Sequence, residues 1–317
     1  MNLQQLRIIR EAARCNYNLT EVANTLYTSQ SGVSRHIKEL EDELNIELFI
    51  RQGKRLINMT EPGHELVIIA ERILDEISNI RRLSTVFSNK EEGALVIATT
   101  HSQSRYILPK IIKSFHEFFP QVLMTINQGS ANEITDMVLS GEADIAIYNQ
   151  KNSHTAIVNY PFYRWHYTII VPKNHPLTKE KMITLEMLNR FPIITYRPGI
   201  FARESIDDAF AAHGLTANIT LNVQESDIIK SYVELGLGVG ILVNKMFDSE
   251  HDTNLVQIDA EHLFSSHLTW IGVKRYQLHR NYIWRFIQLC NTELSLDEIK
   301  ARALASEDKL NIIDYQI

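Results

Sequence analysis

The chain has 317 residues, more than one ordinary hydrophobic core requires, and this length favours two or three domains. With 44% apolar and 22% charged residues, its composition is that of a globular protein and excludes a chain that stays disordered throughout. The formal net charge of −6, taken alone, argues against a nucleic-acid partner.

The negative charge is unevenly distributed along the chain. Residues 1–90 contain 12 basic and 12 acidic side chains, whereas residues 91–317 contain 20 and 26. The basic side chains of the first segment occur in groups, for example at Arg35 and Lys38. We therefore expect this segment to present a basic face to a phosphate backbone, although the whole chain is acidic.

The sequence shows no export signal and no membrane segment. Its two cysteines, Cys15 and Cys290, are too few and too far apart to build a disulfide framework, which fits a reducing compartment. The N-terminus lacks a basic segment followed by an apolar stretch, and no run of 18 uncharged apolar residues occurs. We expect a cytoplasmic protein without a membrane partner.

The first forty-five residues predict a helix-turn-helix. Apolar residues at helical spacing indicate two short helices within residues 3–26. After a short break, residues 29–40 predict a third helix, whose buried stripe continues to Leu44. Its opposite face carries hydrogen-bond donors of a length suited to base edges in a major groove.

Residues 46–60 are typical of a wing, because two short extended pieces flank a basic turn at Gly53. Cations in such a turn can reach phosphates or the minor groove. A polar helix face or a basic turn on its own is usually only solvated, but the two in succession are more specific. The candidate DNA-binding residues are Thr28, Ser29, Gln30, Ser31, Ser34, Arg35, Lys38, Lys54 and Arg55.

Two runs of residues in this segment form a long signature. They are Thr28-Ser29-Gln30-Ser31-Gly32-Val33-Ser34 and Leu40-Glu41-Asp42-Glu43-Leu44, the second followed by Leu48-Phe49. The segment resembles the DNA-binding domain of LysR-type transcriptional regulators. The resemblance implies a homo-oligomer, a dimer or a tetramer, that binds double-stranded promoter DNA and acts on RNA polymerase.

Residues 61–90 predict a connecting helix, which starts after a capping Thr60 and has Pro62 in its first turn. Its apolar residues alternate by four and three, as in a heptad seam. The helix could lie on its own domain, but the family resemblance implies that it pairs two subunits. The seam consists of Leu66, Ala70, Ile73, Ile77, Ile80, Ser84 and Phe87.

From residue 91 onward, predicted strands alternate with helices, which indicates parallel β-α-β units. Two such sets and a returning strand near residues 268–273 predict two lobes around a hinged cleft. This part resembles the effector-binding domain of the LysR family, which is similar to periplasmic solute-binding proteins. The predicted fold class is therefore α/β. We expect a winged helix-turn-helix at residues 1–60, a dimerising linker helix at 61–90 and an effector-binding domain at 91–317. Within that domain, lobe one covers about 91–165 and 267–317, and lobe two covers about 166–266.

A polar segment lies between the first predicted strand and the first predicted helix of lobe one. The hydroxyls of Thr100 and Ser102 and the amide of Gln103 could bind a small oxyanion, because the carboxyl ends of such strands face the ligand crevice. The alternative is that these residues only cap the helix.

Residues 98–109 read Ala98-Thr99-Thr100-His101-Ser102-Gln103-Ser104-Arg105-Tyr106-Ile107-Leu108-Pro109. This segment resembles the CysB/Cbl branch of the family, and residues 280–286 and 313–317 are especially similar to the Cbl side of that branch. The resemblance implies an activator of sulfur-assimilation or sulfate-starvation genes, with sulfate, acetylated serine or adenosine phosphosulfate as the type of effector. The candidate effector-binding residues are Thr100, Ser102, Gln103, Ser130, Asn149 and Phe201.

Residues 199–203 depart from the pattern of the branch. Phe201 stands where branch members carry a threonine, and Ala202 stands where they carry a glycine. The first change removes a hydroxyl and adds a ring, and the second adds a Cβ where the backbone could otherwise approach closely. We therefore expect a smaller or more apolar pocket, or one that takes another ligand.

No motif in the sequence indicates catalysis. The glycines of residues 236–240 follow a predicted helix and precede a strand, the reverse of the order in a dinucleotide loop, and no histidines have metal-ligand spacing. We expect no enzymatic activity, no cofactor and no metal. A regulator of another pathway, or a solute-binding protein, remains an alternative, and deletion of residues 1–60 would distinguish a transport binder from a regulator.

Overall fold

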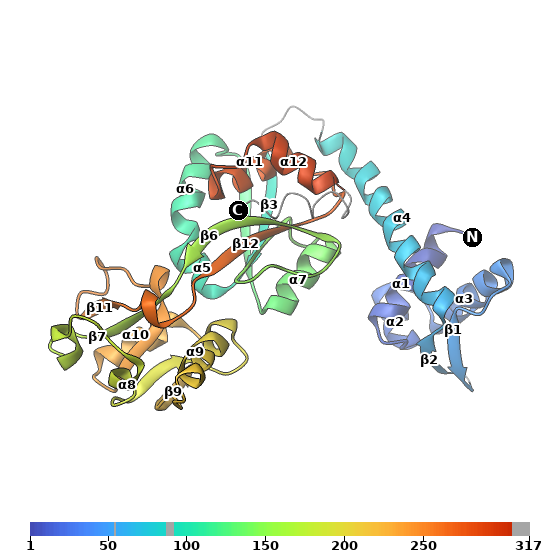
Figure 1. Ribbon diagram of the computed structural model, residues 1–317. Coiled ribbons are helices and arrows are strands. Elements are labelled where there is room, and N and C mark those ends of the chain that lie inside the picture. Colours follow the sequence, from blue (N-terminus) through green and yellow to red (C-terminus); the bar gives the residue numbers. More distant parts are fainter. Residues whose placement is uncertain (54, 87–91, 306–317) are drawn as a thin grey trace. The chain divides into compact units, whose positions relative to one another are not determined.

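The structure is a computed structural model that describes residues 1–53, 55–86 and 92–305 (Figure 1). It divides into two compact units, residues 1–89 and residues 90–317. Each unit encloses its own hydrophobic core and is described by itself.

The first unit contains the predicted helix-turn-helix and wing. Its elements are α1 (Leu3–Arg14), α2 (Leu19–Thr25), α3 (Gln30–Leu44), β1 (Phe49–Gln52), β2 (Arg55–Met59) and α4 (Glu61–Val86), and β1 pairs with β2 in antiparallel fashion. Asn18 caps α2, and the Ser29 hydroxyl caps α3 by accepting from the Gly32 amide at 3.1 Å. Val33 and Ile37 are buried as predicted, but Leu44 is 36% exposed because α3 ends beyond the core.

One carboxylate attaches the wing to α3. Oε1 of Glu41 accepts hydrogen bonds from the amides of Leu48 at 2.9 Å and of Phe49 at 3.2 Å, and its Oε2 lies 2.6 Å from the Arg51 guanidinium. These bonds join the end of α3 to the first residues of β1. The position of the wing beside the helix is therefore set by side-chain chemistry as well as by core packing.

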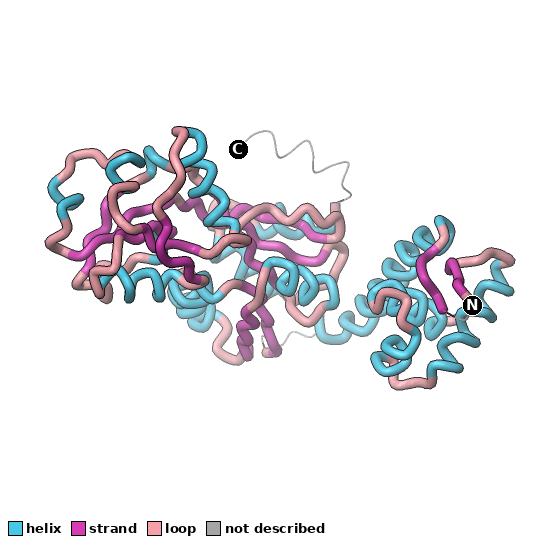
Figure 2. The backbone as a smooth tube through the Cα atoms, turned by 90° about the horizontal axis from the view of Figure 1, so that it is seen from below, coloured by secondary structure: helices cyan, strands magenta, loops and turns pink. Residues whose placement is uncertain are grey.

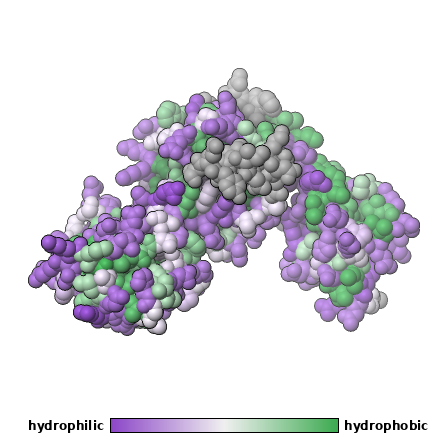
Figure 3. Space-filling model, viewed as in Figure 1, coloured by the Kyte–Doolittle hydropathy of each residue, from purple (hydrophilic) through white to green (hydrophobic). Residues whose placement is uncertain are grey.

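The predicted seam of α4 has two different environments. Ala70 packs with Leu74 against Leu6 of α1, so this part of the helix lies on its own unit. The prediction that the seam faces a partner helix is therefore wrong at Ala70, because α1 already covers that position. Further along, Ile80 is 64% exposed, and apolar residues are visible on the surface along α4 in Figure 3. Phe87 lies outside the described residues.

The second unit consists of two lobes, each built on a five-stranded mixed sheet (Figure 2). In lobe one the strand order is β4 (Val122–Gln128), β3 (Gly93–Thr99), β5 (Ile145–Tyr148), β12 (His267–Lys274) and β6 (Ile157–Trp165). In lobe two it is β11 (Leu255–Asp259), β7 (Tyr167–Pro172), β10 (Val239–Val243), β8 (Ile193–Tyr196) and β9 (Ile219–Val223).

Helices accompany both sheets. In lobe one these are α5 (His101–Tyr106), α6 (Leu108–Phe118), α7 (Ala131–Ser140), α11 (Asn281–Cys290) and α12 (Leu296–Leu304). In lobe two they are α8 (Leu185–Leu188), α9 (Phe201–Ala212) and α10 (Ser226–Glu234), with 3₁₀ turns at Pro176–Lys179, Asn244–Met246 and Glu261–Leu263.

Two crossings connect the lobes. β6 continues into β7 through the single residue His166, and the chain returns from β11 to β12 across residues 260–266. Each sheet therefore contains antiparallel strands beside its parallel ones, since β12 pairs antiparallel with β5 and β6, and β7 does so with β10 and β11. Hinged lobe movement is the ordinary property of such a pair of crossings.

The glycines after α10 serve packing. Gly236 has a φ of +78°, which suits a turn at the end of the helix. A Cβ on Gly238 would lie 2.4 Å from the carbonyl oxygen of Pro192, and one on Gly240 would lie 2.5 Å from Cγ1 of Ile170. Residues 236–240 therefore lead into β10 between closely packed neighbours. They share only their glycine content with a phosphate-binding loop.

Candidate DNA-binding face and interlobe cavity

The outer face of α3 carries the polar side chains that the sequence singled out. Gln30, Ser31 and Lys38 are exposed, and Ser34 is half-buried between them. The guanidinium of Arg35 lies 3.4 Å from the carboxylate of Glu39, one helical turn further on. Such an exposed ion pair contributes little stability, so Arg35 can exchange Glu39 for a base or a phosphate.

The start of α3 and the wing extend this face. Thr28 and Ser29 are exposed just before the helix, and Arg55 is exposed at the start of β2. Lys54 lies outside the described residues. Tyr27, in the turn between α2 and α3, is 98% exposed with a φ of +51°.

A cavity of about 680 Å³ lies between the two lobes. The structure brings all six candidate effector residues to its lining, where they come from lobe one and from the start of α9. Several lining residues had not been predicted, because no local pattern singles them out. They are Tyr163, Trp165, Tyr196, Arg197 and Glu225.

The side chains of Gln103 and Thr100 form most of their hydrogen bonds within the protein. Oε1 of Gln103 accepts from the Thr99 hydroxyl at 2.7 Å, and its Nε2 donates to Oδ1 of Asn149 at 2.8 Å. Thr100 caps α5, since its hydroxyl accepts from the Gln103 amide nitrogen and donates to the Gln103 side chain. Thr100 therefore caps α5, as the alternative interpretation predicted. Gln103 is buried beside the cavity and links the segments around it by hydrogen bonds.

Ser102 and Ser130 also form hydrogen bonds in the cavity wall. The hydroxyl of Ser102 donates to Oε2 of Glu225 at 3.3 Å, which joins lobe one to lobe two. Ser130 caps α7, and its hydroxyl donates to the Glu133 carboxylate at 2.8 Å. These bonds from the backbone and hydroxyl of Ser130 hold the pKa of Glu133 below its ordinary value.

Phe201 opens α9 at the aromatic side of the cavity. Its ring packs edge-on against Trp165, with centroids 6.3 Å apart, and against His267, with centroids 5.0 Å apart. The Ser205 hydroxyl lies 2.9 Å from Nε2 of His267, whose pKa is lowered by burial. The residue that replaces the expected threonine therefore belongs to an aromatic wall instead of offering a hydroxyl.

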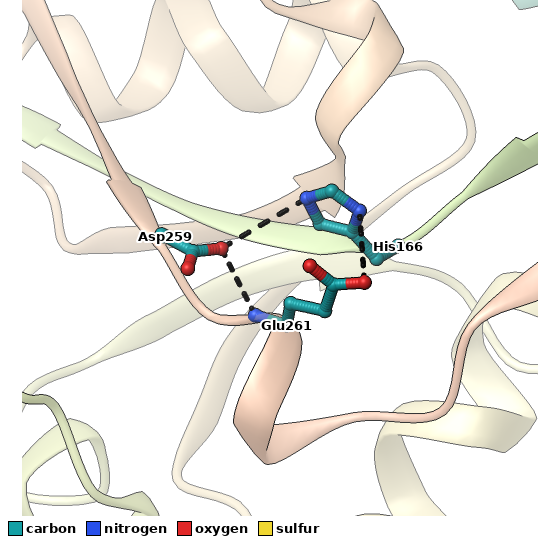
Figure 4. A group of neighbouring side chains, drawn as sticks. All are labelled: His166, Asp259 and Glu261. Carbon is teal, nitrogen blue, oxygen red and sulfur yellow. Dashed lines mark hydrogen bonds and ion pairs between the residues drawn. The ribbon is translucent and has the colours of Figure 1, made fainter.

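A histidine and two carboxylates gather at the lobe crossings (Figure 4). Nε2 of His166 lies 3.9 Å from Oδ1 of Asp259, and its Nδ1 lies 3.9 Å from Oε1 of Glu261. The two carboxylates thus approach opposite nitrogens of one ring, whereas a metal ion binds a single ring nitrogen. The arrangement is that of a histidine flanked by two carboxylates, and it does not favour a metal centre.

Among the residues that the structure describes, no helix combines the length and the apolar character needed to cross a bilayer.

Two family models match the chain, in the order of its two units. "Bacterial regulatory helix-turn-helix protein, lysR family" matches residues 3–64, and "LysR substrate binding domain" matches residues 88–295. The predicted combination of an N-terminal helix-turn-helix with a two-lobed α/β domain is thereby confirmed.

Curated relatives match over nearly the whole chain. The HTH-type transcriptional regulator cbl of Escherichia coli (strain K12) is 54% identical over 100% of both chains. The HTH-type transcriptional regulator SsuR of Burkholderia cenocepacia is 46% identical over 94% of this chain and 97% of its own. The predicted resemblance to the CysB/Cbl branch is confirmed by these identities.

Solved structures share the fold. The cofactor-binding domain of the Cbl transcriptional regulator matches with a TM-score of 0.65 and 46% identity, over 69% of this chain and 97% of that chain. Full-length OxyR from Pseudomonas aeruginosa matches with a TM-score of 0.61 over 95% of both chains, and at 23% identity it supports the fold alone. From the two models and these relatives, we conclude that the chain belongs to the LysR family of bacterial helix-turn-helix regulatory proteins.

Proposed function

We propose that this chain is a cytoplasmic activator of sulfur-assimilation or sulfate-starvation genes that responds to a small sulfur-related effector. The observation that carries the proposal is the 54% identity to the regulator cbl over the full length, together with the hydroxyl-bearing cavity of the second unit. The role is regulatory rather than catalytic.

The first unit supplies the DNA-binding surface of the proposed regulator. Gln30, Ser34 and Arg35 lie on the outer face of α3 and are our candidates for base contacts in a major groove. Thr28, Ser29, Ser31 and Lys38 surround them and suit phosphate contacts. Lys54 and Arg55 of the wing add sequence-independent affinity that depends on salt.

The cavity supplies the effector site. Ser102 has a hydroxyl at the interlobe face, and Asn149 and Ser130 line the same space. Sulfate, acetylated serine and adenosine phosphosulfate all present oxygens that such donors can hold. An effector that contacts both lobes shifts their relative position, because it binds one lobe arrangement better than another.

We propose that the protein acts as a dimer or a tetramer. Ile80 and Leu83 are exposed near the described end of α4, where a partner helix would remove them from water. Two subunits would place two recognition helices on successive half-sites of DNA. A change in lobe position would alter the spacing of these helices, the bending of the DNA and the access of RNA polymerase.

A second candidate is a regulator of another pathway with a different effector. The aromatic wall formed by Phe201 and Trp165 favours this candidate, since it replaces the hydroxyl expected from the branch pattern. A solute-binding role has no such observation behind it.

Calorimetric titration of the full chain with sulfate, acetylated serine and adenosine phosphosulfate tests the effector proposal. We expect at least one of them to bind, and Ser102→Ala with Asn149→Ala to weaken that binding. If none binds, or if binding is undisturbed by the double substitution, the sulfur assignment is wrong. Loss of promoter binding after deletion of residues 1–60 tests the DNA-binding proposal separately.

A further inference from the structure

A hydrogen bond crosses the cavity between residues 123 positions apart in the chain. The hydroxyl of Ser102, on α5 of lobe one, donates to Oε2 of Glu225 of lobe two at 3.3 Å. We propose that Glu225 is a specificity-determining residue. Its carboxylate accepts the hydrogen bond of the Ser102 hydroxyl that an oxygen of an anionic effector would otherwise accept. Its negative charge also disfavours the binding of anions in proportion to their charge. The proposal rests on the effector role of the cavity proposed above.

The carboxylate of Glu225 is directed to the other lobe by the local structure. Glu225 occupies the N-cap position of α10, yet its side chain forms no capping bond. The next residue is fixed in place, because Oγ of Ser226 lies 2.8 Å from the buried Tyr196 hydroxyl, which also accepts from the Val243 amide at 3.2 Å. The backbone at Glu225 is therefore anchored to the core of lobe two while its carboxylate reaches lobe one.

Glu225 accepts fewer hydrogen bonds than Glu133, the other carboxylate in the cavity wall. Glu133 accepts from both the backbone amide and the hydroxyl of Ser130, at 2.7 and 2.8 Å, within its own helix cap. Glu225 has one partner across the cavity, and it takes part in none of the ion pairs found among the described residues. Its negative charge therefore acts on whatever enters the space beside Ser102.

Two physical consequences follow. A hydroxyl has one proton to donate, so Ser102 cannot serve Glu225 and an effector oxygen at the same time. The Coulomb energy between Glu225 and a bound anion is proportional to the charge of that anion, so a dianion is opposed by twice the energy that a monoanion meets at the same distance. Because affinity depends exponentially on free energy, the fold-change for the dianion is the square of that for the monoanion.

The test is calorimetric titration of the full chain with sulfate, a dianion, and with methanesulfonate, a monoanion whose head group is similar, at constant ionic strength. Glu225→Gln keeps the size of the side chain and an acceptor for Ser102 but removes the charge. We expect this variant to bind methanesulfonate about threefold and sulfate about tenfold more tightly than the unmodified chain does. Glu225→Ala provides a second variant without the charge, with the same order of gains expected.

Glu180→Gln is the matched control, since Glu180 is exposed in lobe two and does not line the cavity. It should leave the affinity for both anions unchanged. Equal gains for the two anions in Glu225→Gln would mean that the residue acts by shape and not by charge, and would overturn the proposal. So would a failure of both Glu225 variants to gain affinity for sulfate.

The proposed regulatory function has a separate readout. Promoter binding, and its response to acetylated serine or adenosine phosphosulfate, can persist when the Glu225 variants show no gain for sulfate. That combination would overturn the role of Glu225 alone. Loss of every effector response in the unmodified chain would instead contradict the proposed function.

Discussion

Nε2 of Gln103 lies 2.8 Å from Oδ1 of Asn149, and this bond joins the first turn of α5 to the end of β5 in the wall of the cavity. Gln103 is only 1% exposed, and its Oε1 accepts from the hydroxyls of Thr99 and Thr100. The amide thus connects two strand ends of lobe one across a buried space. A side chain placed in this way supports the shape of the cavity before it contacts any ligand.

Gln103→Ala should lower the free energy of unfolding by about 1–3 kcal/mol, because it leaves the buried Thr99 hydroxyl without its acceptor and Oδ1 of Asn149 without its donor. Urea unfolding of the full chain measures the change. Gln150→Ala is the control, since Gln150 is exposed at the cavity rim and should change stability little. Equal stability of the two variants would show that the Gln103 network carries no net energy.

Arg35→Ala should weaken binding to promoter DNA by about 1–3 kcal/mol at fixed salt and relax the preference at one base position, as loss of a base contact does. Titration of labelled promoter fragments and of single-base variants measures both effects. Arg190→Ala removes an exposed arginine of the second unit and should change neither. Unchanged affinity in Arg35→Ala would remove this residue from the recognition surface.

Arg55→Ala should reduce affinity by a similar factor for all DNA sequences and lower the slope of log affinity against log salt by about one, because a wing cation neutralises a phosphate. The measurement is a series of binding curves at several salt concentrations with two unrelated DNA fragments. A change in sequence preference without a change in slope would instead place Arg55 at a base.

Lys230→Met should lower the free energy of unfolding by about 3–5 kcal/mol, because it leaves the largely buried carboxylate of Asp252 without a counter-charge. The ammonium lies 2.8 Å from Oδ2 of Asp252, donates to the carbonyl of Met246 at 3.1 Å and lies 4.7 Å from the ring centroid of Tyr106. Adding Asp252→Asn to Lys230→Met should recover part of the loss in urea unfolding. A double variant less stable than Lys230→Met would contradict this explanation.

Ile80→Asp should weaken self-association at least about tenfold, since it places a charge where a partner helix would bury an exposed apolar side chain. Sedimentation equilibrium of the full chain measures the association constant. Ile68→Asp is the control, because Ile68 is also exposed on α4 but lies outside the seam. If Ile80→Asp and Ile68→Asp weakened association equally, the effect would come from a general loss of apolar surface and not from the seam.

Much of the first unit could be predicted from the sequence because its signals are local. Helical spacing places Val33 and Ile37 on the buried side of α3 and Gln30 and Lys38 on the outer side. Caps such as Ser29 lie within three residues of the groups that they satisfy. The same reasoning located the wing turn at Gly53, whose φ is +64°.

The second unit was predicted less completely. The strands β6 and β11 were not anticipated, and neither was α5, the short helix His101–Tyr106 that precedes α6. The start of α5 has a local signal in the sequence, since Thr100 and Gln103 form a capping box, and Pro109 in the first turn of α6 marks where the second helix begins. The crossing strands have no such local signal.

The sequence by itself determined the family, the alternation of strands and helices, and the candidate residues, because periodicity, capping and motif spacing act over a few residues. Only the tertiary structure decided what those residues do: Gln103 is committed to Asn149, Phe201 packs beside Trp165, and Ser102 meets Glu225. These pairs are separated by 36 to 123 positions, and their contact depends on how two sheets fold and cross. Short-range sequence patterns contain no information on that geometry, which is why Glu225 in the cavity wall was not predicted.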